Sequence, residues 1–191
     1  MGLFLALLIA FVVSHIALAS PPLRDLLVAR MGDKLWTAGV GAYHVSNLVM
    51  LVAAILFAGS LTPRNKALAG VPAGLAGGRA TGVMRITRHP MMWAFALWAI
   101  VHVVLSGNLP TVLLAGGIGI LALVGSAFQD VKKRQKLGAD WAAYERETSW
   151  LPFAAILSGR QPLSALWPGV VPVVLGVILW LVLTFLHPSL M

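Results

Sequence analysis

The sequence predicts an all-α protein, a polytopic bundle of about five transmembrane helices in a single membrane domain over residues 1–191. Apolar residues make up 59% of the chain and charged residues only 10%, against roughly 25% charged residues in soluble globular domains. Four long stretches contain no Asp, Glu, Lys or Arg, and a helix needs about 20 apolar residues to span a bilayer. These features exclude a disordered chain, a coiled coil and a nucleic-acid-binding module.

The four uncharged stretches divide into five helices. They cover residues 1–23, 35–62, 90–129 and 161–191. The third is about twice as long as a bilayer core at roughly 1.5 Å per residue, so it must fold back, and its Gly, Asn and Pro at 107, 108 and 110 predict the turn. We expect helices near 2–19, 37–60, 90–106, 111–129 and 165–187. Residues 17–19 are typical of a signal-peptidase site, but no positive charge precedes the apolar run, so we expect an uncleaved first helix.

The distribution of Lys and Arg predicts the orientation of the bundle. The connections 61–89 and 130–164 together hold eleven of these residues, and the remaining connections and termini hold three. Because basic loops stay in the cytoplasm, we expect both connections and the N-terminus to lie inside and the C-terminus outside, in a bacterial inner membrane. We also expect Asp140 and Glu145–Glu147 to belong to an exposed, basic cytoplasmic juxtamembrane helix, with Trp141 and Tyr144 on the membrane surface. The formal net charge of +8 then reflects the orientation of the chain in the membrane and does not indicate a nucleic-acid-binding surface.

No Asp, Glu, Lys or Arg lies within the expected spans, but three histidines do: His15, His44 and His102. The expected topology places all three in the outer half of the membrane, where ionisable side chains are usually functional. The chain has no cysteine, which excludes an iron–sulfur cluster, a thiolate-bound metal and covalently attached haem. Two facing imidazoles can hold a b-type haem, and small residues such as Ala99 would admit a flat macrocycle. The alternatives are hydrogen bonds between helices and, less favoured, a three-histidine copper or zinc site.

Several motifs together resemble the NnrU family of bacterial membrane proteins, which is related to 15-cis-ζ-carotene isomerase. The first is Ser14-His15, in the first expected helix. The second is Arg88-His89-Pro90, which opens the third expected helix, with His102 thirteen residues after His89. The others are Thr-Ser-Trp-Leu-Pro-Phe-Ala-Ala-Ile at 148–156 and Leu-His-Pro-Ser-Leu at 186–190.

The resemblance implies a haem b held between two axial histidines, which match His15 and His102 in this sequence. His44 would then be an alternative or distal ligand, or a hydrogen-bonding group between helices, and His89 would be structural or interfacial. The implied activity is a redox-gated cis–trans isomerisation of a hydrophobic polyene, or a role in nitrogen-oxide metabolism. The implied partners are the lipid bilayer, a hydrophobic small molecule or nitric oxide, and a redox partner.

A second resemblance, to isoprenylcysteine and phospholipid methyltransferases, predicts a different activity. Those enzymes also open a helix with Arg-His-Pro and carry a Gly- and Tyr-containing cytoplasmic segment, which Gly138 and Tyr144 match here. The chain would then use S-adenosylmethionine on the cytoplasmic side. The residues facing that cofactor would be Arg88, His89, Tyr144 and Glu145. A non-catalytic haem sensor or assembly factor is the third interpretation.

Overall fold

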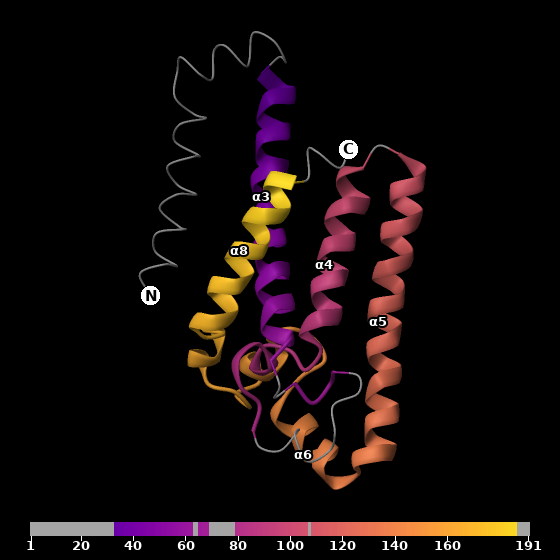
Figure 1. Cartoon of the computed structure of the whole chain (residues 1–191), viewed down its shortest axis with the longest axis vertical. Coiled ribbons are helices and arrows are strands. Elements are labelled where there is room, and N and C mark those ends of the chain that lie inside the picture. Colours follow the sequence, from indigo (N-terminus) through magenta and orange to yellow (C-terminus); the bar gives the residue numbers. More distant parts are fainter. Residues whose placement is uncertain (1–32, 63–64, 69–78, 107, 187–191) are drawn as a thin grey trace. The chain divides into compact units, whose positions relative to one another are not determined.

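The computed structural model describes residues 33–62, 65–68, 79–106 and 108–186, and within this part the protein is all-α. The described residues form six α-helices: α3 (Asp33–Ser60), α4 (Pro90–Leu105), α5 (Leu109–Leu137), α6 (Ala139–Glu147), α7 (Ala154–Leu157) and α8 (Val170–Leu186) (Figure 1). Two short 3-10 helices, η2 (Gly82–Arg85) and η3 (Leu163–Leu166), lie between them. The chain divides into two compact units, residues 1–48 and 49–191, and each is considered by itself. The expected helix near 2–19 and its His15 lie outside the described residues.

The predicted fold-back between the third and fourth helices is confirmed. Helix α4 ends at Leu105 and α5 begins at Leu109, and the two helices lie side by side (Figure 1). Asn108 caps α5, because its side-chain oxygen accepts a hydrogen bond of 2.9 Å from the Thr111 N–H, which satisfies one of the unpaired donors of a helix start. Pro110 occupies the first turn, where a missing N–H costs nothing.

The end of α5 and the start of α8 differ most from the prediction. Helix α5 continues through the basic residues 132–136 to Leu137, because Lys, Arg and Gln favour helix as strongly as most apolar residues do. It ends at Gly138, whose φ of 51° is a conformation that favours glycine. Helix α8 begins at Val170 and not near 165, because Pro168 and Gly169, with φ 101°, precede it.

Small residues let the long helices pack closely. A methyl group built on Gly119 of α5 would lie 2.8 Å from the Ala99 Cβ of α4. One built on Gly176 of α8 would lie 2.6 Å from the Ile55 Cα of α3. Helices of membrane proteins commonly use small residues in this way, since close contact and van der Waals packing drive their association.

Two described helices are apolar and long enough to cross a membrane, Leu109–Leu137 and Leu163–Leu186, the second counted from η3. The shorter helices His44–Ser60 and Pro90–Leu105 are also apolar. Large apolar side chains are exposed along α5 and α8, including Leu113, Leu121, Val170 and Phe185. An extended apolar surface of this kind suits lipid and not water, so the helices indicate membrane association.

The main buried cluster lies where the connecting segments meet the ends of the long helices. Trp141 and Tyr144 of α6 are 0% and 1% exposed, and they pack with Met84, Ile86 and Leu56. The expectation that Trp141 and Tyr144 lie on the membrane surface is therefore wrong. The expected juxtamembrane helix does form, as α6, but its two aromatic side chains pack into the protein core.

Candidate functional site

His102 lies in the last turn of α4, and its ring orientation is fixed by Trp98. The Nδ1 of His102 is 2.8 Å from the Trp98 carbonyl oxygen, and the two rings stack with centroids 4.3 Å apart. A carbonyl oxygen can only accept a hydrogen bond, so Nδ1 carries the hydrogen. In the neutral ring the lone pair is then on Nε2, which is the form of histidine that binds metals.

The other predicted ligands lie outside the unit that holds His102. His44 is buried, at 5% exposed, and belongs to the first unit, whereas His102 belongs to the second. His15 lies outside the described residues. Ala99 does not line a slot between α4 and α5, because it packs directly against Gly119. Among the described residues, no group of three or more His, Asp or Glu side chains could hold a metal ion.

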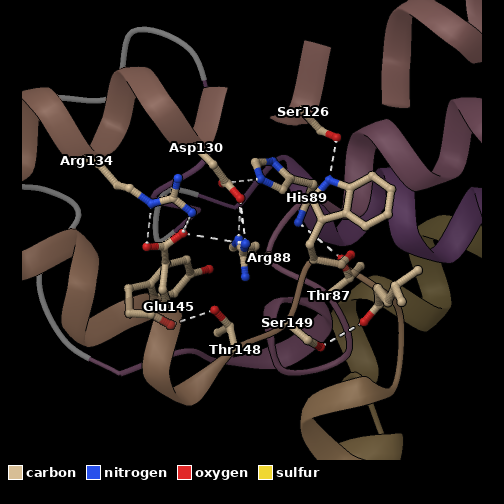
Figure 2. A network of polar contacts seen from close by, with 12 residues as sticks. Thr87, Arg88, His89, Ser126, Asp130, Arg134, Glu145, Thr148 and Ser149 are labelled. Atoms are coloured by element: carbon tan, nitrogen blue, oxygen red, sulfur yellow. Dashed lines mark hydrogen bonds and ion pairs between the residues drawn. The ribbon is translucent and has the colours of Figure 1, made fainter. Parts of the chain in front are cut away.

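A network of charged side chains forms at the opposite end of α4, where Asp130 of α5 is the central acceptor (Figure 2). One carboxylate oxygen of Asp130, Oδ1, is 2.6 Å from Nε2 of His89. The other, Oδ2, accepts two hydrogen bonds from Arg88, of 2.9 Å from Nε and 2.5 Å from Nη2. The Asp130 side chain is only 6% exposed, and a buried carboxylate requires such charged and hydrogen-bonded partners.

The network extends from Arg88 onto α6. Nη2 of Arg88 lies 3.5 Å from Oε1 of Glu145, and Glu145 also accepts a forked pair of hydrogen bonds from Arg134, of 2.9 and 2.7 Å. Charges therefore alternate in sign from Asp130 through Arg88 and Glu145 to Arg134 (Figure 2). This alternation neutralises the four charges within the protein and holds α5 and α6 to the start of α4.

The segment at 148–153 positions Arg88 and His89 through backbone hydrogen bonds. The Arg88 N–H donates to the Ser149 carbonyl at 2.9 Å, and the Phe153 N–H donates to the Ile86 carbonyl at 2.8 Å. Phe153 has φ 66°, a left-handed conformation that is uncommon outside glycine. The Thr87 hydroxyl adds a hydrogen bond of 2.8 Å to the Trp150 carbonyl. The motif at 148–156 thus orders the Arg88-His89 pair.

Three buried polar atoms near this network have no hydrogen-bond partner: Nδ1 of His89, the Tyr144 hydroxyl and Nε1 of Trp141. Burial raises the pKa of the Tyr144 hydroxyl above its ordinary value, so the group stays protonated. The Lys66 ammonium lies 5.0 Å from the centre of the Tyr144 ring, a cation–π contact. His89 also lines a cleft of about 80 Å³ at the start of α4.

The structure gathers the four residues that the methyltransferase interpretation names: Arg88, His89, Tyr144 and Glu145. Sequence reasoning missed Asp130, which joins Arg88 to His89. The signal was present, because Asp130 is the first charged residue after a 40-residue uncharged stretch and lies two residues before Lys132 and Lys133. An acidic residue at that position is unusual within a basic cytoplasmic connection.

Comparison with known proteins places the chain in a family. The model of the family described as NnrU protein matches residues 33–191. Similar proteins include the chloroplastic 15-cis-zeta-carotene isomerase of Arabidopsis thaliana, 40% identical over 85 residues, and that of Zea mays, 38% identical over 85 residues. The matched part covers 44% of this chain and 23% of each isomerase. No solved structure matches. The chain belongs to the NnrU family, as its motifs predicted, and is distantly related to 15-cis-zeta-carotene isomerase.

Proposed function

We propose that this chain is a multi-pass membrane protein that binds haem b through His102 and catalyses cis–trans isomerisation of a hydrophobic polyene. The second axial ligand in this proposal is His15, with His44 as the alternative. The observation that carries the proposal is the hydrogen bond from Nδ1 of His102 to the Trp98 carbonyl, because it puts the ring hydrogen on Nδ1 and so selects the neutral tautomer with its lone pair on Nε2, a form in which histidine binds iron. The distant relatives named as carotene isomerases support this activity over a nitrogen-oxide role.

The residues of α4 have defined tasks in this proposal. When bound, haem b would supply iron that can donate electron density to a double bond and lower its barrier to rotation. His102 holds the cofactor, and the stacked Trp98 ring keeps the imidazole from rotating. Apolar helices exclude water from a polyene that is insoluble in it. The fold supplies position and a dry environment, and the cofactor supplies the electronic chemistry.

The proposed membrane arrangement is five spans with the N-terminus inside and the C-terminus outside, in a bacterial inner membrane. The asymmetry of eleven Lys and Arg against three supports it. In this arrangement the charged network around Asp130 lies on the cytoplasmic side, and His102 lies toward the outer side of α4.

The visible spectrum of the purified full-length protein tests haem binding. Protein expressed with ample haem should show a Soret band and, after dithionite reduction, the split α and β bands of low-spin haem. His102→Ala should lose the haem or convert it to high spin, because alanine has no nitrogen to bind iron. His89→Gln is the matched control and should keep the low-spin spectrum, since His89 lies thirteen residues, or roughly 20 Å, along the helix.

The same measurement identifies the second ligand. His15→Ala and His44→Ala are compared, and the substitution that abolishes the low-spin spectrum removes the axial partner of His102. A colourless wild-type protein, or a His102→Ala variant with the wild-type spectrum, would contradict haem ligation by His102.

A methyltransferase that uses S-adenosylmethionine is the second candidate, favoured by one observation. Arg88, His89, Tyr144 and Glu145 lie around one end of α4. The cleft beside His89, at about 80 Å³, is small against the roughly 300–1,000 Å³ of typical cofactor sites, which ranks this candidate below the isomerase. Colourless protein that binds radiolabelled S-adenosylmethionine, and loses it in Arg88→Gln, would reverse the ranking.

A further inference from the structure

The cleft beside His89 has the chemistry of a ligand site that the proposed haem function does not use. It lies at the start of α4 and has a volume of about 80 Å³. Its polar lining residues are Asn65, His89 and Gln129, and its apolar ones are Ala67, Leu68, Pro90, Met91 and Met92. Among the described residues that line it there is no Asp, Glu, Lys or Arg, so a neutral ligand suits the cleft better than an ion.

Two of the polar lining side chains have a polar group without a hydrogen bond in the described part of the chain, whereas Asn65 is already bound to the backbone. The Asn65 amide nitrogen donates to the Ser60 carbonyl, and its oxygen accepts from the Ala67 N–H. Nδ1 of His89 is buried and has no partner among the described residues, and the His89 side chain is only 1% exposed. Gln129 is half-buried, and its amide makes no hydrogen bond within the described part of the chain.

The Asp130 contact decides the role of His89 at this cleft. Asp130 accepts two hydrogen bonds from Arg88, as an ionised carboxylate does, and a carboxylate can only accept. The contact of 2.6 Å between Nε2 of His89 and Oδ1 of Asp130 therefore requires the hydrogen to be on Nε2. In the neutral imidazole Nδ1 then carries a lone pair, which is an acceptor. Burying an acceptor without a donor is unfavourable. Because Nε2 is occupied by Asp130, the Nδ1 edge is the one left for a group in the cleft.

We propose that this cleft binds the hydroxyl end of a neutral, lipophilic alcohol or phenol. The hydroxyl hydrogen is donated to Nδ1 of His89, and the hydroxyl oxygen accepts a hydrogen bond from the Gln129 amide. A hydroxyl group is the simplest group that both donates and accepts, as these two side chains require. The cleft volume admits only the hydroxyl end, and the flexible side chains of Met91 and Met92 contact the apolar remainder.

Direct binding to the full-length protein in detergent tests the proposal. The probe is tritiated 1-decanol, and methyl decyl ether is the matched ligand that keeps the oxygen but lacks the donor. Gln129→Leu removes one hydrogen bond and His89→Phe removes the other, and each should weaken binding of 1-decanol about tenfold. Gln135→Leu makes the same substitution at an exposed position of α5 and should leave binding unchanged.

The outcomes separate this site from the others. Because Gln129 makes no hydrogen bond in the described structure, Gln129→Leu tests the cleft even where His89→Phe fails to fold. Equal affinity of the wild type for the alcohol and the ether, or unchanged affinity in Gln129→Leu, would overturn the proposal. The proposal would also be overturned if the wild type bound S-adenosylmethionine and not 1-decanol, and if both Gln129→Leu and His89→Phe lost that binding. A colourless protein that binds 1-decanol would support alcohol binding at the cleft and would contradict the proposal that the protein binds haem.

Discussion

His89, the residue that caps the start of α4, and His102, in its last turn, carry their hydrogens on opposite ring nitrogens. His102 donates from Nδ1 to a backbone carbonyl, whereas His89 donates from Nε2 to a carboxylate. In the neutral rings, the lone pair lies on Nε2 of His102 and on Nδ1 of His89. The first form suits an iron ligand whose ring is held by the backbone, and the second suits an acceptor of a ligand's hydrogen bond. Their neighbours therefore give one residue type two different roles in a single helix.

Asp130 is the residue whose loss should cost the most stability at the charged network. Asp130→Asn removes the negative charge that Arg88 and His89 share, and it leaves the Arg88 side chain, 11% exposed, with only the longer 3.5 Å contact to Glu145. Removing one partner of a buried ion pair leaves an uncompensated charge, so we expect the free energy of unfolding to fall by about 3 kcal/mol. Unfolding of the purified protein in a detergent titration measures this change.

Asp140 provides the control for that substitution. It lies on α6 and is exposed, so Asp140→Asn should change the free energy of unfolding by less than about 0.5 kcal/mol. Equal stability of Asp130→Asn and Asp140→Asn would mean that the network contributes no net stability to the fold.

At the scale of the helices, the contact between α4 and α5 depends on glycine at one position. Gly119 faces the Ala99 Cβ, and an added methyl would approach it to 2.8 Å. Gly117, two residues earlier in the same helix, has no other atom within 4 Å of the corresponding point. The two glycines therefore lie in the same helix but have different surroundings.

The substitutions Gly119→Ala and Gly117→Ala test this contact. Alanine favours helix over glycine by about 1 kcal/mol at either site, so Gly117→Ala should keep or raise the melting temperature. Gly119→Ala must push α4 away, and overpacking of this kind costs about 1–3 kcal/mol, so its melting temperature should be lower than that of Gly117→Ala. The same melting temperature for both variants would show that the close approach of Gly119 to Ala99 has no energetic consequence.

Most of the long helices could be predicted from sequence, because uncharged stretches and turn residues are local signals. The break between the end of α4 at Leu105 and the start of α5 at Leu109 lies at the expected turn, and the expected juxtamembrane helix is α6. The far end of α5 could not be predicted from hydropathy, since its last turns are basic and yet helical. The start of α8 was missed because the apolar pattern continues through Pro168 and Gly169, although the backbone there cannot continue a helix.

At the scale of the molecule, the charged network was the least predictable feature. Arg88 and Asp130 are 42 residues apart in the chain, and no periodicity connects them. The segment that forms α6 has the composition of a membrane-surface helix. Only the packing of α6 against η2 and the helix ends shows that its Trp141 and Tyr144 are buried. The Arg-His-Pro motif is compatible with both the haem protein and the methyltransferase, and the side-chain contacts that distinguish them cannot be inferred from the sequence alone.

The orientation of the whole chain gives the last prediction. The connections 61–89 and 130–164 carry eleven of the fourteen Lys and Arg residues, and moving such loops across a bacterial inner membrane is disfavoured. Alkaline phosphatase fused after Met191 should therefore be active, because it reaches the periplasm. Green fluorescent protein fused after Lys136 should fluoresce, and phosphatase fused there should be inactive. If phosphatase fused after Asn65 were active, the chain would have the opposite orientation in the membrane. The buried Asp130 network would then lie on the outer side, and His102 would lie toward the cytoplasm.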